Sequence, residues 1–464
     1  MSKKYDVVIV GAGPAGIFAA LELSRRKGAR VALLDRGAAL GKRKCATLGE
    51  YGRCRRCDPC AITCGWGGAG AFSDGKLTLS PEFGGSLNEY LEPPQLEQLI
   101  HHVDGVYLEH GAADILYGTD TAAIKKLQRD AAAAGLHLIP AQLRHLGTEN
   151  CYRVLEKLYS HLEKKVDIAT GTEVTALLTS GRKAAGVELA SGEQLHADYV
   201  ICGPGRAGAE WMHGEASRLG LKGLNNPVDI GLRIEVPAVL LDDLTGKVYE
   251  SKLIYFSRSF DDRVRTFCMN PYGVVVTENN GGLVTVNGHS YAEKRSENTN
   301  FALLVSKTFT EPFTEPIRYG RYIASLANML GDGVMVQRLG DLQMGRRSTA
   351  ERISRGMVRP TLREATAGDL SLVLPYRHLL SIMEMLEALD RLVPGINSPH
   401  TLLYGVEVKF YSFRLHLTPC LETEIPNLFA VGDGAGVTRG LVQASASGVL
   451  AAREINRRLG CRPE

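Results

Sequence analysis

The distribution of apolar and polar residues along the chain predicts alternating strands and helices. Val7 to Val10 form an unbroken apolar run of strand length, as expected for a strand buried on both faces of a parallel sheet. Residues 14–27 follow with alanine and leucine along the inner face of a helix, and Val31 to Asp35 form a second apolar strand. The chain therefore opens with a strand–helix–strand unit of an α/β fold.

Glycines between the first strand and the helix indicate a phosphate-binding turn. Gly11, Gly13 and Gly16 have G-x-G-x-x-G spacing: the first makes the tight turn, the second admits a pyrophosphate, and the third allows close packing. The amino end of the helix adds free N–H groups and the positive end of the helix dipole. Asp35 can accept hydrogen bonds from the ribose hydroxyls. We expect an adenine dinucleotide here; the turn does not distinguish FAD from NAD.

A second glycine motif, at residues 203–208, follows three short strands predicted over residues 173–178, 184–189 and 193–201. Turn signals between these strands indicate a β-meander. The motif could open a separate NAD(P) domain or mark the return of the meander into the first sheet. We favour the return, because a separate nucleotide domain would begin its own strand–helix–strand unit.

The remaining pattern predicts a second domain inserted into the first. Short strands are expected between residues 228 and 289, and helices at 300–309, 318–330 and 376–392. After a strand at 401–409, an apolar strand ends in Asp433 and is followed by a helix at 441–458. Such an acid can bond a polyol chain beside a helix amino end. We therefore expect an FAD-binding domain at 1–225 and 400–464, and an α+β substrate domain at 226–399.

Composition excludes several classes of function. The chain has 464 residues, 44% of them hydrophobic and 23% charged, as in an ordinary globular enzyme of two or three lobes. A formal charge of +3 does not indicate a nucleic-acid partner. We expect neither a membrane span nor a signal peptide, and hence a cytoplasmic location.

Cysteines are concentrated in one segment. Five of the ten, beginning with Cys45, fall within twenty residues, and the last four have the C-x2-C-x2-C-x3-C spacing of bacterial ferredoxins. The candidate metal ligands are Cys54, Cys57, Cys60 and Cys64. A [4Fe-4S] cluster, a zinc site and unmetallated thiols, with a redox pair among them, stay open as interpretations.

Four parts of the chain together resemble the FAD-binding, glutathione-reductase-like flavoproteins. They are the Gly11 turn with Asp35, the small-residue loop at 67–75, the meander return at Gly203, and the stretch 427–434 ending in Gly-Asp433-Gly. The motifs at 57–60, 67–76, 345–349, 360–362, 368–370 and 432–436 are similar to a bacterial family of FAD-dependent dehydrogenases, over nearly the whole chain.

The resemblance implies a Rossmann-like FAD-binding domain, with a parallel sheet plus β-meander, and FAD as the main cofactor. The residues expected to contact FAD are Gly11, Gly13, Pro14, Ala15, Gly16, Asp35, Arg36, Gly67, Gly68, Ala69, Gly203, Gly432, Asp433 and Gly434. The C-x4-C pair of disulfide reductases is absent after Gly16, which disfavours that activity.

These features predict an FAD-dependent oxidoreductase that exchanges a hydride or electrons with a small organic substrate between the two domains. Cys268, His289 and Arg295, on or after predicted strands of the second domain, are the candidate catalytic residues: Cys268 as nucleophile or proton donor, His289 as general acid. NAD(P)H is a candidate external electron donor. The alternative is a flavin and thiol redox sensor, or an electron-transfer protein with a redox partner protein.

Overall fold

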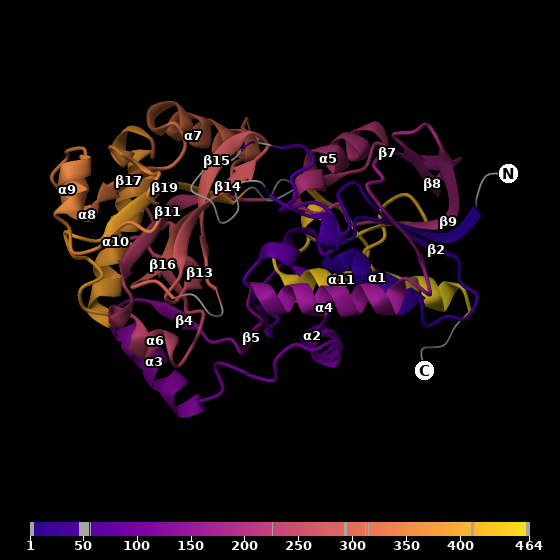
Figure 1. The fold of residues 1–464 in the computed structure, drawn as a ribbon, viewed down its shortest axis with the longest axis horizontal. Coiled ribbons are helices and arrows are strands. Elements are labelled where there is room, and N and C mark those ends of the chain that lie inside the picture. The colour runs from indigo at the N-terminus through magenta and orange to yellow at the C-terminus, as the bar shows by residue number, and fades with distance from the viewer. Residues whose placement is uncertain are drawn as a thin grey trace.

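The computed structural model of the protein describes residues 4–45, 55, 57–224, 226–291, 295–310, 312–313, 315–409 and 413–460. They form two lobes side by side, each built on its own large β-sheet (Figure 1). The first and last named elements, β1 and α11, lie in the same lobe, so the second lobe is inserted into the first (Figure 1).

The first lobe contains a seven-stranded sheet with a parallel core. Its strands are β6 (Asp167–Thr170), β2 (Val31–Asp35), β1 (Lys4–Val10), β9 (Gln194–Cys202), β8 (Lys183–Leu189), β7 (Val174–Ser180) and β21 (Leu428–Ala430). Strand β1 lies between β2 and β9 and is parallel to both. Val7, Val8 and Ile9 are fully buried, as expected for a central parallel strand, and α1 packs against this strand.

Strand β9 joins the meander to the parallel core. It pairs antiparallel with β8 near its start, and its end, Val200–Cys202, pairs in parallel with both β1 and β21. The prediction that the meander returns into the first sheet at Gly203 is therefore confirmed.

Helices α1 and α11 pack closely against one another in this lobe. A Cβ atom on Gly448 of α11 would lie only 1.9 Å from the Ala15 carbonyl oxygen of α1, so this contact requires a glycine. The lobe's named α-helices are α1 (Pro14–Leu23), α2 (Pro93–Glu109), α4 (Thr148–Leu162), α5 (Ala209–Arg218) and α11 (Leu441–Arg458). Their packing brings the amino ends of α1 and α11 to one cavity.

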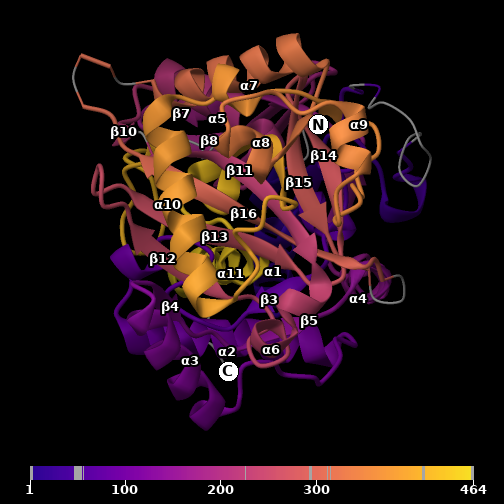
Figure 2. The ribbon, with the colours of Figure 1, turned by 90° about the vertical axis from the view of Figure 1, so that its left-hand side faces the viewer.

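The second lobe is built on an eight-stranded sheet, seen face-on in Figure 2. Its strand order is β18 (Thr366–Ala367), β17 (Met335–Arg338), β19 (Leu402–Lys409), β11 (Val228–Pro237), β16 (Asn298–Lys307), β13 (Arg263–Asn270), β12 (Lys252–Phe256) and β4 (His137–Ile139). The hairpin β14 (Val274–Asn280) and β15 (Leu283–His289) adjoins this sheet. Two small antiparallel pairs complete the strands: β3 (Lys76–Thr78) with β5 (Leu143–His145), and β10 (Gly223–Leu224) with β20 (Arg414–Leu415).

Helices α7 (Pro316–Gly331) and α10 (Tyr376–Leu392) cover the second sheet and close its core. Shorter helices are α3 (Thr121–Ala133), α6 (Asp242–Thr245), α8 (Leu339–Gln343) and α9 (Ala350–Ser354). Among the residues that the structure describes, no helix is both long and apolar enough to cross a membrane.

The predicted helix at residues 300–309 is wrong. This segment belongs to β16, which lies between β11 and β13 and is buried from Asn298 to Val305. An apolar run buried on both faces has no periodicity that separates strand from helix, so pairing with the two neighbours decided its state.

The lobes differ from the expected domain limits in two places. Strand β19, expected in the closing part of the first domain, pairs with β11 and β17 of the second sheet. Helix α3 and strand β4 also contribute to the core of the second lobe, although they precede residue 226. Both pairings join segments distant in sequence, and the local pattern carries no information about them.

Candidate functional site

The first wall of the site is the glycine turn between β1 and α1. Gly11 has φ +99°, and a Cβ atom there would lie 2.1 Å from the Gly203 carbonyl oxygen. A Cβ atom on Gly16 would lie 1.9 Å from the Gly11 carbonyl oxygen. Gly13 differs, because its Cβ would meet only Gly68 Cα, at 3.9 Å. Gly11 and Gly16 are therefore required by packing, while Gly13 keeps space open.

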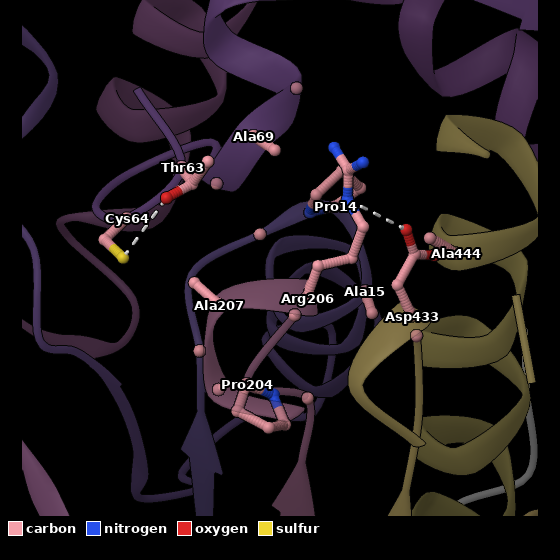
Figure 3. Close-up of a pocket in the computed structure, with 18 of the residues that line it drawn as sticks. Pro14, Ala15, Thr63, Cys64, Ala69, Pro204, Arg206, Ala207, Asp433 and Ala444 are labelled. Atoms are coloured by element: carbon pink, nitrogen blue, oxygen red, sulfur yellow. Dashed lines mark hydrogen bonds and ion pairs between the residues drawn. The ribbon is translucent and has the colours of Figure 1, made fainter. Parts of the chain in front are cut away.

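That space is a cavity of about 340 Å³ beside the turn (Figure 3). Eleven of the residues expected to contact FAD line it: Gly11, Gly13, Pro14, Ala15, Asp35, Arg36, Gly68, Ala69, Gly203, Gly432 and Asp433. Gly16, Gly67 and Gly434 are not among the lining residues; the Gly67 amide donates to the Ala12 carbonyl, and a Cβ on Gly434 would lie 2.8 Å from the Gly205 carbonyl oxygen. These three glycines support the wall from behind.

Asp35 ties three backbone segments together at one end of the cavity. Its carboxylate accepts hydrogen bonds of 2.8 Å from the backbone amides of Ala12, Gly37 and Gly65. The carboxylate thus fixes the glycine turn relative to the loop that carries Cys64. Asp35 thus has a structural role in the backbone, in addition to its predicted role in binding the ribose of the cofactor.

Asp433 lies at the other side of the cavity, facing Arg206 (Figure 3). Its Oδ1 accepts a hydrogen bond of 2.7 Å from Thr438 Oγ1, and its Oδ2 lies 3.9 Å from Arg206 Nε. Burial raises the pKa of Asp433, and the Arg206 guanidinium partly opposes that effect. The carboxyl group is therefore poorly solvated and suited to bind a hydroxyl group.

Two helix amino ends also face this space. Gly13 and Gly440 are the N-caps of α1 and α11, and both line the cavity. Glycine has no side chain to bond the first free N–H groups, which therefore stay available to a ligand. The cavity accordingly fits an anionic pyrophosphate and a polar ring edge, as FAD would present.

The opposite wall belongs to the second lobe. It consists of Phe267, Cys268, Asn287 and Lys409, of which the sequence predicted only Cys268 as a site residue. Lys409 is the last residue of β19, and Asn287 lies near the end of β15. A polar residue at the end of a predicted strand is therefore the sequence signal that could have identified both as site residues. For Thr172–Val174, which line the cavity near Asp35, the sequence contains no comparable signal.

A chain of charged side chains runs along this wall. Arg233 and Glu407 are completely buried and form a bidentate pair, with distances of 2.7 and 3.0 Å. Lys409 Nζ lies 3.0 Å from Glu407 and 3.5 Å from Glu278. Glu278 in turn lies 3.3 Å from Arg206 of the first lobe.

This chain connects the two lobes electrostatically. Burial would raise the pKa of Glu278, but Lys409 and Arg206 outweigh it and the pKa is lowered. Glu278 is therefore a carboxylate at neutral pH, and it holds the two cations on either side of the cavity.

The three candidate catalytic residues are not brought together. Cys268 lines the cavity, and burial raises the pKa of its thiol, with Lys76 opposing. His289 packs edge-on against Tyr291, and burial lowers its pKa. Arg295 is exposed over the ring of Tyr272. Of the described residues lining the two cavities of the cleft, only Cys268 comes from the predicted catalytic set.

A larger cavity of about 870 Å³ adjoins the first and is lined by residues of both lobes. Arg206, Phe267, Lys409 and Asp433 line both, so the two spaces share a wall. The turn of the β14–β15 hairpin, residues 279–282, forms part of its far side. A small molecule in this space would lie against the residues where the lobes meet.

The cysteine run borders both cavities. Cys57 and Cys60 line the larger and Cys64 the smaller one, while Cys54 lies outside the described residues. Within the part of the chain that is described, no group of three or more His, Cys, Asp or Glu side chains is arranged to hold a metal ion. The described cysteines therefore do not fit the expected iron–sulfur or zinc site.

Sequence comparisons identify flavoprotein families along the chain. Residues 6–49 match the family described as FAD dependent oxidoreductase, and residues 227–410 match the FAD-dependent protein, C-terminal domain-like family. Residues 369–463 match glucose inhibited division protein A. Separate parts of the chain are thus similar to FAD-dependent oxidoreductases and to other FAD-dependent proteins. FAD is thereby supported as the cofactor of the cavity, whereas the finer family placement stays a prediction.

Individual proteins that resemble this chain do so at low sequence identity. An uncharacterized protein of Clostridium beijerinckii is 29% identical over 476 residues, covering 97% of this chain and 80% of that protein. Among solved structures, glycine oxidase from Geobacillus kaustophilus is 14% identical, with a TM-score of 0.41, 98% of this chain and 95% of that chain covered. L-proline dehydrogenase from P. horikoshii is 11% identical, with a TM-score of 0.42 and coverage of 99% and 95%.

Proposed function

We propose that this FAD-dependent oxidoreductase relative exchanges a hydride or electrons with a small organic substrate bound in the cleft between its lobes. The observation that carries the proposal is that two cavities share lining residues: one lies beside the glycine turn, the other between residues of the two lobes. When bound, FAD supplies the redox chemistry, and the protein orients the reactants and handles protons.

The residues of the first lobe suit the parts of FAD. Gly13 and the amino end of α1 would hold the pyrophosphate, and Asp35 the adenosine ribose. Asp433, buried beside the amino end of α11, would accept a hydroxyl of the polyol chain. The reactive end of FAD would then face Cys268 and Lys409 of the second lobe.

Cys268 is our candidate for the proton-exchanging group. It lines the cavity and, because burial raises its pKa, it carries its proton at neutral pH. A protonated thiol can give a proton to a substrate that receives a hydride, and its thiolate can take a proton when the substrate is oxidised. His289 and Arg295 lie outside both cavity walls and are weaker candidates.

The decisive experiment is FAD binding to the purified protein. We expect yellow protein, or uptake of one equivalent of added FAD with a change in flavin absorbance and fluorescence. Anaerobic addition of NADH, NADPH and a panel of small hydroxy and amino acids should then bleach the flavin for the correct reductant. Colourless protein that takes up no FAD would overturn the proposal.

A redox relay is the second candidate, favoured by the cysteines at the cleft. Cys57 is exposed and Cys60 partly exposed, and both line the larger cavity, where another protein or a thiol reagent could reach them. Catalytic turnover with a small molecule would support the enzyme; stoichiometric thiol oxidation without turnover would support the relay.

A further inference from the structure

A buried lysine, Lys76, lies directly behind the cavity wall. It belongs to β3 of the first lobe, and only 8% of its side chain is exposed. Its Nζ donates a hydrogen bond of 2.6 Å to the Met269 carbonyl oxygen and lies 3.9 Å from Cys268 Sγ. Lys76 therefore crosses from the first lobe to the segment of the second lobe that carries Cys268, a residue of the cavity wall.

The backbone at Cys268 is shaped to present that thiol. The pairing of β13 with β16 shifts register between Phe267 and Asn270, and Cys268 has φ +46°. This left-handed conformation is uncommon outside glycine and is maintained here by hydrogen bonds. The Cys268 carbonyl oxygen accepts from Arg233 Nη1 at 3.2 Å and from the Asn270 side-chain amide at 2.8 Å. The bulge thus places Cys268 at the cavity wall, with its sulfur beside Lys76 and its carbonyl in the buried network.

Carboxylates complete the surroundings of Lys76. Asp74 Oδ2 lies 3.1 Å from Nζ and Glu250 Oε2 lies 3.6 Å from it. The charged groups that act on Cys268 are Lys76 and Arg233, which favour a thiolate, and Asp74 and Glu250, which disfavour it. His145 and His289 also act electrostatically on Asp74.

A simpler role for Lys76 would be an ion pair that joins the lobes. Asp74 and Glu250 alone would provide the partners for that role. It does not account for the direction of the shortest hydrogen bond from Nζ, which goes to the residue after Cys268, nor for the position of the ammonium beside the sulfur.

We propose that Lys76 is a positioning residue, which holds the Cys268 thiol at the cavity wall and stabilises the thiolate that remains after proton transfer. This inference rests on the proposed function, in which Cys268 exchanges a proton with the substrate. The Sγ–H bond breaks, the proton passes to a basic atom of the substrate, and the negative charge stays on sulfur 3.9 Å from the Lys76 ammonium. A proton from solvent restores the thiol.

The test measures Cys268 itself. Alkylation by iodoacetamide is followed at Cys268 by peptide mass spectrometry as a function of pH, because only the thiolate reacts. Lys76→Met removes the ammonium charge and keeps a similar side-chain length. At pH values below the pKa of Cys268, we expect alkylation of Cys268 to slow about tenfold, because raising the thiol pKa by one unit lowers the thiolate fraction tenfold. Lys76→Arg should restore most of the rate, and Glu250→Gln should increase it severalfold.

Lys252→Met is the matched control, since Lys252 is a half-buried lysine over the ring of Phe83 and does not line the cavity. It should leave the Cys268 profile unchanged. Equal Cys268 profiles in wild type, Lys76→Met and Glu250→Gln would overturn the proposal. If Lys76→Met does not fold, Glu250→Gln and Lys76→Arg still decide it: faster alkylation in the first with a near-wild-type rate in the second supports the proposal, and an unchanged rate in Glu250→Gln overturns it. FAD titration of the same variants reports separately on the proposed function, because alkylation can be measured without FAD.

Discussion

The two walls of the cavity are built on different physical principles. The first-lobe wall is largely backbone: glycines at 11, 13, 68, 203 and 432 with two helix amino ends. The second-lobe wall is side chains, and its Lys409 belongs to a network anchored by the buried pair Arg233–Glu407. The first wall offers mainly backbone shape and partial charges, with Arg206 and Asp433 as a charged pair at its edge. The second wall offers a thiol and a lysine tied to a buried network of ion pairs.

The difference predicts how each wall responds to change. A backbone wall fails when a Cβ atom is added, because no rearrangement makes room between two peptide groups. A charged wall fails when one partner is removed, because the other stays buried without compensation. The predictions below test this contrast.

The largest effect is expected for Gly11→Ala. Its Cβ would lie 2.1 Å from the Gly203 carbonyl oxygen at φ +99°, so the turn must open and FAD binding should be lost. The cost in unfolding free energy should exceed about 4 kcal/mol, the range of severe core disruption. Gly13→Ala is the matched control: its Cβ enters the cavity, so FAD affinity should fall while chemical denaturation stays within about 1 kcal/mol of wild type. Similar stability losses in both variants would contradict the contrast.

Arg233→Met tests the second wall. It leaves Glu407 fully buried without its bidentate partner and removes a donor to the Cys268 carbonyl, so we expect a loss of about 3–5 kcal/mol in urea unfolding. Arg295→Ala, which removes an exposed arginine over Tyr272, should change stability by less than about 0.5 kcal/mol. A small effect of Arg233→Met would show that Lys409 alone suffices to compensate the buried Glu407 carboxylate.

Acid should weaken the second lobe through His378. Burial lowers its pKa from 6.5 to about 4, so the unfolded chain binds a proton more readily than the folded lobe between these values. Stability should therefore fall as pH drops from about 6.5 to 4, by up to about 3 kcal/mol at 1.36 kcal/mol per pKa unit. His378→Gln should remove that part of the pH dependence in urea unfolding. An unchanged slope in the variant would assign the acid sensitivity to other groups.

Asp433→Asn should produce the smallest effect of the set. The substitution keeps the size of the side chain but removes the charge that would accept a flavin-side hydroxyl, so FAD affinity should weaken about tenfold, or about 1.4 kcal/mol. Fluorescence titration with FAD measures this directly. Unfolding without FAD should change little or even improve, because the buried carboxyl group is itself poorly solvated, as its raised pKa indicates.

The sequence determined the parts of this protein that depend on neighbours along the chain. The helices predicted at 376–392 and 441–458 match α10 and α11, because their periodic patterns and boundary signals are local. The G-x-G-x-x-G turn with Asp35 was also recognisable, because its glycine spacing and its acid lie within one strand–helix–strand unit. Its packing against Gly203 and Gly65 was not, because these residues come from distant segments.

Only the tertiary structure decided what the second wall contains. Lys76 meets Cys268 across 192 positions, and Arg233 meets Glu407 across 174. Residues 298–307 form a strand because β11 and β13 pair with them on both sides. Strand β19 belongs to the second sheet because it pairs with β11 and β17. Pairing free energy between distant segments leaves no periodic trace in either segment, so the sequence specified the glycine wall and folding in three dimensions supplied the charged one.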